Sequence, residues 1–397
     1  MAFRPDTFAL TALLAMLISM GPVSTDLYLP SLPDIGRVLG ATTAQVQLTL
    51  SAFLVGFAAG QILYGPVSDK YGRKPVLVIA LVLYGVGTAL CAAAQSIETL
   101  TAARCLQALG AAGPIVVARA IVRDLYEGRR AARELALMGT FMSVMPAIAP
   151  IFGGVLHVAF GWRSTFAIML IYAACALVLV MVQLPETLRE RSTAPISPIG
   201  ILRTFGTIVV DRTFLANTLI FAAGYSGLFS FISSSSFILQ GVYGLGPIGA
   251  GASFSTCVIG FVSGSIIGTP LVARLGEDMA IRIGIGLQAL GALAMAAALG
   301  IGGLGLAGIL APMAAYTLGF GITMPQTLSA AMKPFPDKAG AASSLAGFIQ
   351  MSSGAIAGVF VGHALGNSAW PLAAALGVTA SIAVGTYLAN RFVQTAR

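Results

Sequence analysis

Residues 76–94 read VLVIALVLYGVGTALCAAA and contain no charged side chain. A helix that crosses the hydrocarbon core of a bilayer, roughly 30 Å thick, needs about 20 predominantly apolar residues. A membrane-spanning β-strand would instead alternate apolar and polar residues over about ten positions. The stretch therefore predicts a transmembrane α-helix.

The composition of the whole chain agrees with a membrane location. Of 397 residues, 57% are hydrophobic and 9% are charged, whereas a soluble domain carries about 25% charged residues. This excludes a water-soluble fold. The four cysteines lie inside apolar runs and form no CxxC pattern, so neither a disulfide framework nor a metal site is expected.

Hydropathy predicts twelve spans in two groups of six, an all-α membrane protein. The spans lie near residues 8–29, 44–66, 75–95, 97–120, 135–158, 165–184, 213–239, 249–272, 280–300, 303–330, 338–362 and 368–390. Residues 1–184 are expected to form one six-helix bundle, residues 185–212 a cytoplasmic linker, and residues 213–397 a second bundle. A shift of 204 residues lays Pro66, Lys70 and Gly72 over Pro270, Arg274 and Gly276, which favours a duplicated unit.

Basic residues predict the orientation of the spans. With the N-terminus in the cytoplasm, 19 of the 22 Lys and Arg residues fall on the cytoplasmic side, Arg4 and Arg397 among them. Arg37 and Arg163 fall outside, and Arg104 lies within the fourth span. Both termini are therefore expected in the cytoplasm. The net charge of +8 reflects this bias and not binding to nucleic acid.

The loop after the second span, residues 65–75, reads GPVSDKYGRKP. Gly65 would allow close helix contact, Gly72 a tight turn, and Asp69 could accept hydrogen bonds at a helix end. The loop resembles motif A of the major facilitator superfamily. Two further motifs resemble those of the same superfamily: motif B at Arg104, Gln107 and Gly110, and the antiporter motif C at Pro150, Gly153 and Gly154. Motif C is incomplete, since Met145 and Ala149 stand where it has glycines.

The end of the first span indicates which branch of the superfamily the chain resembles. Residues 24–33 read STDLYLPSLP, and Arg123 and Asp124 follow the fourth span. These residues resemble the bicyclomycin-resistance and chloramphenicol-efflux branch of the drug/proton antiporters. The resemblance implies a monomer in the bacterial inner membrane, with two pseudo-symmetric bundles, that exports small amphipathic drugs by alternating access. The proton gradient would supply the energy, with no cofactor.

Two charges, Asp26 and Arg104, are predicted to lie well inside spans, at similar depths below the outer surface. A charge at the centre of a span costs roughly 2.5–3.5 kcal/mol on the lenient insertion scale, so such residues are functional candidates. We expect Arg104 to keep Asp26 ionised in one state, and loss of this contact in another state to let the carboxyl group take a proton. The alternative is a static pair that only joins the first and fourth spans.

A cavity between the two bundles would also need apolar surface for a substrate. Beside Asp26 and Arg104, the candidate substrate-binding residues are Tyr28, Gln107, Asn217, Phe221, Tyr225, Phe229 and Tyr316. Asn217, Phe221 and Tyr225 follow one another at four-residue spacing, which places them on one helix face. Any one of these side chains could instead serve only in helix packing.

Charged residues at the cytoplasmic ends of the spans predict a gate. The predicted cluster comprises Asp69, Arg73, Arg119, Arg123 and Asp124. Ion pairs among them would close the inner mouth and stabilise the outward-open state. For the loop at residues 65–75, the alternative is a short charged loop that only determines topology.

Other functional classes fit the sequence less well. The spans show neither a nucleophile with a base, as an enzyme would need, nor the charge rings of a channel. No GxxxxGK[ST] motif for ATP-driven transport occurs. Within transport, the alternative to drug export is proton-coupled export of a metabolite such as an amino acid or a sugar.

Overall fold

The apolar stretches of the sequence form helices in the computed structural model, which describes residues 8–188, 190–193, 197–366 and 368–395. Twelve helical segments are long and apolar enough to cross a membrane, and these ranges contain no strand. This confirms the predicted all-α class with twelve spans. Arg4 and Arg397, which the topology argument used, lie outside the described residues.

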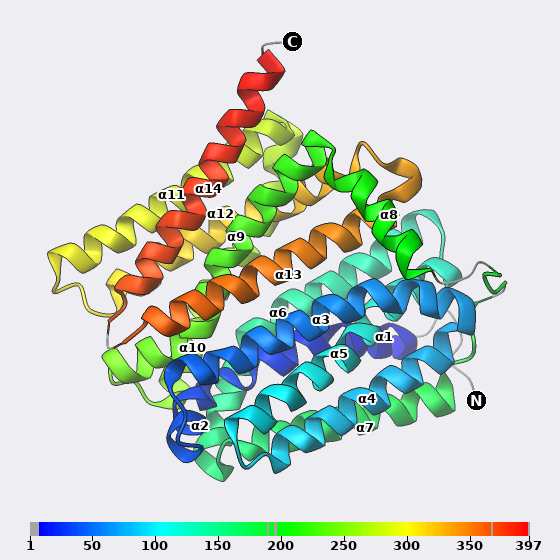
Figure 1. The fold of residues 1–397 in the computed structure, drawn as a ribbon, viewed down its shortest axis with the longest axis horizontal. Coiled ribbons are helices and arrows are strands. Elements are labelled where there is room, and N and C mark those ends of the chain that lie inside the picture. Colours follow the sequence, from blue (N-terminus) through cyan, green and yellow to red (C-terminus); the bar gives the residue numbers. More distant parts are fainter. Residues whose placement is uncertain (1–7, 189, 194–196, 367, 396–397) are drawn as a thin grey trace. The chain divides into compact units, whose positions relative to one another are not determined.

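The chain divides into two compact units (Figure 1). The first comprises residues 1–41 and 52–196, and the second comprises residues 42–51 and 197–397. The spanning helices up to the linker are α1 (Phe8–Asp26), α3 (Thr43–Tyr71), α4 (Arg73–Ala93), α5 (Ile97–Leu125), α6 (Gly128–Phe160) and α7 (Arg163–Gln183). Those after the linker are α9 (Arg212–Ser236), α10 (Pro247–Leu275), α11 (Glu277–Ile301), α12 (Ala307–Met332), α13 (Ala339–Ala364) and α14 (Trp370–Thr395).

The first span is longer than predicted and is broken near its C-terminal end. After α1 the chain forms a 3-10 turn (Leu29–Ser31) and the short helix α2 (Leu32–Val38). Pro30 and Pro33 stand near the start of these two segments. Proline has no amide hydrogen and fits the first turn of a helix better than its interior. Asp26 is therefore the last residue of a regular helix.

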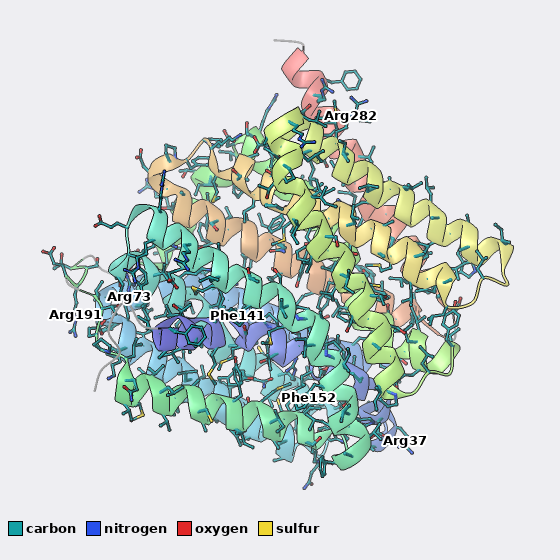
Figure 2. All side chains as sticks on the ribbon, turned by 180° about the vertical axis from the view of Figure 1, so that it is seen from behind. Arg37, Arg73, Phe141, Phe152, Arg191 and Arg282 are labelled. Atoms are coloured by element: carbon teal, nitrogen blue, oxygen red, sulfur yellow. The ribbon has the colours of Figure 1, made fainter. Side chains whose placement is uncertain are left out.

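Basic side chains are found at both ends of the first unit. Figure 2 places Arg73 and Arg191 at one end and Arg37 at the other. The sequence predicts the same separation, with Arg73 and Arg191 in cytoplasmic segments and Arg37 on the opposite side of the membrane. Phe141 and Phe152 of α6 are about half exposed, at 40% and 49%, as expected of side chains that face lipid.

The predicted linker contains a helix that hydropathy did not indicate, α8 (Pro198–Val209). The Ser197 hydroxyl caps it by accepting a hydrogen bond from the Gly200 amide at 3.0 Å. Ile208 is buried in a cluster that includes Phe214 and Ala331. Twelve residues are too few to cross a bilayer, so α8 does not change the number of spans.

The two units use the same scheme of helix pairing. In the first, α1 packs on α6, and α4 packs on both α5 and α7. In the second, α9 packs on α13, and α11 packs on both α12 and α14. Numbered by order within each unit, the first span pairs with the fifth, and the third pairs with the fourth and the sixth.

Close backbone contacts repeat as well. A Cβ atom at Gly56 of α3 would lie 2.5 Å from the Cys105 carbonyl oxygen in α5. A Cβ atom at Gly260 of α10 would lie 2.6 Å from the Ala314 carbonyl oxygen in α12. Gly260 follows Gly56 by 204 residues, the shift that relates the two loops in the sequence. Small residues therefore determine how closely corresponding helices approach in each unit.

The tight turn predicted at Gly72 is present. Gly72 has φ +105°, and Gly276, 204 residues later, has φ +83°. Residues other than glycine rarely adopt positive φ angles, so glycine is favoured at both positions. The turns let α4 and α11 begin directly after the preceding helix ends.

Candidate functional site

Arg104 is completely buried in α5 of the first unit. Its Nη1 atom donates to the Ser24 carbonyl oxygen of α1 at 2.9 Å and to Gln107 Oε1 at 2.6 Å. The guanidinium carbon lies 4.8 Å from the ring centre of Tyr28 and 4.4 Å from that of Phe53. Two aromatic rings and two polar oxygens thus surround a cation deep inside a membrane helix, an arrangement that offsets part of its desolvation.

Asp26 is also buried, with 5% exposure, at the end of α1. Its Oδ1 atom accepts a hydrogen bond from the Thr25 hydroxyl at 3.0 Å. The ion pair considered for Asp26 and Arg104 is not formed among the described residues. Instead, Arg104 Nη1 binds Ser24 and Gln107, and its guanidinium packs against the rings of Tyr28 and Phe53. Arg104 Nε and Nη2 have no hydrogen-bond partner in the described structure.

A polar chain extends from Arg104 into α4. The Gln107 amide nitrogen donates to Thr88 Oγ1 at 2.9 Å, and the hydroxyls of Ser24 and Tyr84 lie 2.7 Å apart. Sequence reasoning did not single out Ser24, Tyr84 or Thr88. Tyr84 and Thr88 are separated by four residues on α4, a spacing that places both on one face.

The structure also buries charged side chains near the ends of spanning helices. Two further charged side chains are buried, Arg73 at 7% exposure and Glu134 at 8%. Glu134 falls outside the predicted fifth span, which begins at residue 135, whereas α6 begins at Gly128. Arg73 is the first residue of α4, although the predicted third span begins at residue 75.

Aromatic candidates cluster in the second unit. Phe221 and Tyr225 of α9 both contact Phe320 of α12, with ring centres 6.5 Å and 6.4 Å away. Tyr225 also stacks on Phe229 at 6.1 Å, and Phe261 of α10 lies 5.8 Å from Phe320. Phe320 is therefore at the centre of the cluster, although no sequence pattern distinguishes it from other phenylalanines.

Tyr316 and Asn217 use their polar atoms within the second unit. The fully buried Tyr316 hydroxyl lies 3.0 Å from Thr379 Oγ1 and donates weakly to the Gly224 carbonyl oxygen at 3.4 Å. Asn217 Nδ2 donates to the Thr213 carbonyl oxygen at 2.8 Å within α9. These bonds join helices or satisfy the backbone, and neither residue contacts the aromatic cluster through a ring interaction.

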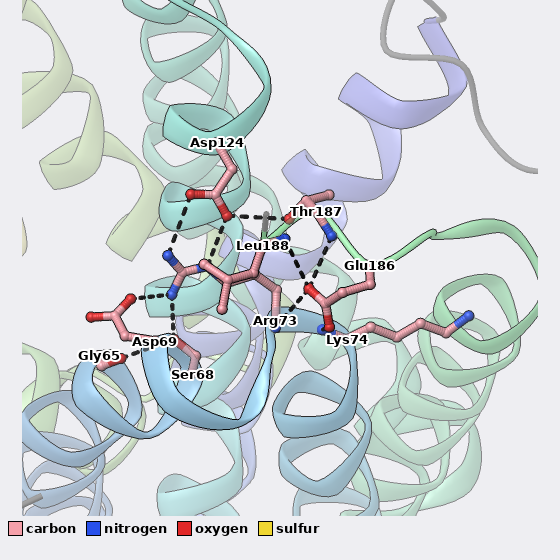
Figure 3. A network of polar contacts seen from close by, with 9 residues as sticks. All are labelled: Gly65, Ser68, Asp69, Arg73, Lys74, Asp124, Glu186, Thr187 and Leu188. Carbon is pink, nitrogen blue, oxygen red and sulfur yellow. Dashed lines mark hydrogen bonds and ion pairs between the residues drawn. The ribbon is translucent and has the colours of Figure 1, made fainter. Parts of the chain in front are cut away.

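The predicted gate cluster is centred on Arg73 (Figure 3). Arg73 Nε donates to Asp124 Oδ2 at 2.8 Å, and its Nη1 atom donates to Ser68 Oγ at 2.8 Å and pairs with Asp69 Oδ1. One guanidinium thus joins the ends of α3, α4 and α5. Because Arg73 presents a planar fork of donors, it can serve several acceptors at once.

Arg119 and Arg123 do not join this network. Both are exposed, and among the described residues neither forms an ion pair; Arg119 Nη2 only approaches the Met142 sulfur at 4.0 Å. The network instead includes Glu186, directly after α7. Glu186 Oε1 accepts from the Arg73 amide at 3.0 Å, and Oε2 accepts from the Lys74 amide at 3.3 Å.

The contact with Glu186 explains the local backbone. A carboxylate at the first amides of α4 compensates the unpaired N–H groups and the dipole of that helix. A Cβ atom at Gly72 would lie 2.5 Å from Glu186 Oε2. A side chain at residue 72 would therefore displace the Glu186 carboxylate, in addition to straining the backbone. The acidic residue after a span was a visible signal that sequence reasoning did not use.

The remaining motif glycines differ in their surroundings. A Cβ atom at Gly65 would meet no heavy atom within 4 Å in the described structure, so close contact is not its role there. A Cβ atom at Gly153 would lie 2.0 Å from the Leu27 carbonyl oxygen, so α6 packs directly against the end of α1. Pro150 and Gly154 are buried on the same part of α6.

Comparisons with known proteins agree with this architecture. A family model described as Major Facilitator Superfamily matches residues 8–358. The uncharacterized MFS-type transporter YdgK of Bacillus subtilis (strain 168) is 33% identical over 379 residues, which are 95% of this chain and 94% of that protein. A bicyclomycin resistance protein homolog of Haemophilus influenzae is 27% identical over 390 residues, which are 97% and 96% of the two chains.

A solved structure shares the fold at low sequence identity. The nucleoside transporter NupG matches with a TM-score of 0.72 and 14% identity, over 96% of this chain and 98% of that one. With the twelve spans and the motif residues in place, these matches show that the chain is a multi-pass membrane transporter and belongs to the Major Facilitator Superfamily.

Proposed function

We propose that the chain is a proton-coupled antiporter that exports small amphipathic compounds by alternating access, with both termini in the cytoplasm. The observation that carries the proposal is the burial of Asp26 and Arg104 in one unit without an ion pair between them. A buried carboxylate and a buried cation that are not paired with each other are costly, so their retention suggests a task beyond packing.

The coupling of proton release to conformation depends on which group neighbours the Asp26 carboxyl group. In the present arrangement the carboxyl group of Asp26 has a hydroxyl neighbour, Thr25, and we propose that it carries a proton. In a second conformation Arg104 would turn its Nε or Nη2 donors, which lack partners here, toward Asp26. The ion pair would then replace the proton, which leaves to water. Proton loss and conformation would be linked by that one contact.

The substrate would contact the aromatic cluster of the second unit. Phe221, Tyr225 and Phe320 offer flat, polarisable faces that accept many ring-containing compounds without strict geometry. Support also comes from the relative named for bicyclomycin resistance. A metabolite such as an amino acid or a sugar would need more directional polar contacts than this cluster offers.

The network around Arg73 would act as the gate at the predicted cytoplasmic end. It holds α3, α4 and α5 together through Ser68, Asp69 and Asp124. We propose that it stabilises the outward-open state. If Asp69→Asn left both transport and the labelling of a cysteine probe at the inner mouth unchanged, the gate would be disproved.

The coupling can be tested in proteoliposomes that enclose a pH-sensitive dye, with chloramphenicol and a panel of amphipathic drugs as probes. Wild-type protein should move protons against drug, and Asp26→Asn should abolish this movement. Asp34→Asn is the matched control, because Asp34 pairs with the exposed Arg37 outside the regular part of the first span. Drug-driven proton movement at the wild-type rate in Asp26→Asn would exclude Asp26 as the carrier.

A susceptibility screen separates the two kinds of substrate. A drug-sensitive host that expresses the chain should survive higher concentrations of several drugs than the same host with Asp26→Asn. Unchanged susceptibility to every drug, together with export of labelled amino acids or sugars, would instead favour the metabolite exporter.

A further inference from the structure

Glu134 is a buried charge that the proposed function does not use. It lies six residues into α6, is 8% exposed, and accepts a hydrogen bond at Oε2 from the Thr11 hydroxyl of α1 at 2.8 Å. Among the described residues it forms no ion pair. A carboxylate in this position is costly, since one neutral hydroxyl compensates only part of its lost hydration.

Among the described residues, no cation is dedicated to Glu134. On α6 the nearest basic residues are Arg130 and Arg133; the Arg130 guanidinium stacks 4.8 Å from the Tyr126 ring centre, and Arg133 is exposed. The neighbouring end of α5 carries the exposed Arg119 and Arg123, and Asp124, which binds Arg73. The described part of α1 adds only Asp26, and α7 adds only Arg163 at its other end.

Glu134 and Asp26 mark opposite ends of one packed helix pair. Thr11, Ser19 and Asp26 recur at spacings of eight and seven residues, which places them on one face of α1. Thr11 and Asp26 are 15 residues apart, or about 22 Å along the helix at 1.5 Å per residue. At the far end of α6, Gly153 packs directly on the Leu27 carbonyl oxygen. The pair thus holds one buried carboxylate near each end.

We propose that Glu134 is a second proton-exchanging carboxylate, through which protons that enter at Asp26 leave the first unit at its predicted cytoplasmic end. This inference rests on the proposed function. The chemistry is acid–base only. A hydronium ion formed on the Asp26 side gives its proton to a Glu134 oxygen and becomes water, and the protonated carboxyl group then gives that proton to cytoplasmic water. The Thr11 hydroxyl can donate to the ionised form and accept from the protonated form, so it serves both states.

Substitution by glutamine separates this role from a structural one. In Glu134→Gln the side-chain carbonyl oxygen can still accept the bond from Thr11, so the contact between α1 and α6 survives. The proton-binding capacity is lost. Glu127→Gln is the matched control, because Glu127 is exposed immediately before α6.

The first measurement does not depend on transport. Infrared difference spectra of the reconstituted full chain, recorded during a pH titration, should show a carboxyl C=O band that disappears in Glu134→Gln and persists in Glu127→Gln. Thr11→Val should shift the titration midpoint of that band, whereas Thr11→Ser should leave it in place. Absence of a band that depends on Glu134 would overturn the proposal.

The second measurement uses chloramphenicol-driven proton flux in proteoliposomes. Glu134→Gln should slow the flux by about tenfold or more and remove its dependence on pH at the cytoplasmic face, while chloramphenicol affinity stays within about twofold. A wild-type pH profile in Glu134→Gln, with flux abolished by Asp26→Asn, would overturn the role of Glu134 and leave the antiporter intact. Absence of drug-coupled flux in wild-type protein would instead contradict the proposed function, while the infrared band would still test whether Glu134 exchanges protons.

Discussion

Arg104 donates through Nη1 to the backbone carbonyl oxygen of Ser24 at 2.9 Å. Ser24 lies two residues before Asp26 in the last turn of α1. The cation of α5 is thus attached to the backbone of α1 beside the buried carboxylate, without touching the carboxylate itself.

Replacement of Arg104 by lysine should therefore impair transport although the charge is retained. An ammonium group cannot bind Ser24 and Gln107 while it presents a flat face to the rings of Tyr28 and Phe53, so we expect a loss of about tenfold or more. Drug uptake into inverted membrane vesicles measures the effect. Arg37→Lys, at a side chain with 81% exposure, is the control and should transport normally. Equal rates in both variants would contradict the proposed role of the guanidinium.

The crossing of α4 and α5 should be intolerant of a single methyl group. A Cβ atom at Gly110 would lie 2.3 Å from the Tyr84 amide nitrogen, so Gly110→Ala must separate the two helices. We expect a loss of about 1–3 kcal/mol or more in the free energy of unfolding. Gly139→Ala in α6 meets no atom within 4 Å and should be neutral or stabilising by up to about 1 kcal/mol. Thermal unfolding in detergent compares them, and similar melting temperatures would refute the packing argument.

The second unit carries a charge-reversed counterpart of the Arg73–Asp124 pair. Glu277 follows Arg73 by 204 residues, Lys333 follows Asp124 by 209, and the two form an ion pair. Side-chain exposure is 8% and 17% in the first pair, but 25% for Glu277 and 60% for Lys333. Burial decides how much each pair contributes to stability.

Removal of one charged partner should therefore lower the free energy of unfolding more in the buried Arg73–Asp124 pair than in the exposed Glu277–Lys333 pair. Asp124→Asn removes one of the two carboxylates that bind the buried Arg73 guanidinium, while Asp69 remains, and should cost about 1.5–3 kcal/mol. Lys333→Gln exposes its partner to water and should cost about 0.2–1 kcal/mol. Denaturant or thermal unfolding of the two variants gives the comparison. A larger loss for Lys333→Gln would show that exposure does not determine the strength of these pairs.

Phe320 should determine which drugs are exported. Phe320→Leu keeps an apolar side chain but removes the ring that contacts Phe221, Tyr225 and Phe261. Resistance should then change by different factors for different drugs, because ring-containing substrates lose a stacking partner. Phe360→Leu, at a residue with 73% exposure, is the control. A uniform change across the panel, matched by a lower protein level, would indicate a folding defect and not a change of specificity.

Much of the fold could be predicted because a bilayer imposes strong local rules on sequence. Each span must be apolar over about 20 residues and must satisfy its own backbone hydrogen bonds, so twelve helices can be counted from hydropathy. Charges are expelled to the loops, which made the motif around Asp69 and Arg73 visible. The same rule identified Asp26 and Arg104 as exceptions, and the structure buries both.

Only the tertiary structure decided which groups meet. Arg104 binds Ser24 and Gln107. Arg73 binds Glu186 through its backbone amide and does not contact Arg119 in the described structure. Phe320 contacts aromatic residues of α9. Glu134 changed from a loop residue to a buried carboxylate because α6 starts earlier than hydropathy indicated. Hydropathy reports how each residue partitions between water and lipid, whereas partners depend on how helices rotate and pair. Rotation and pairing arise from close contacts such as those at Gly56 and Gly110, between residues far apart in the chain.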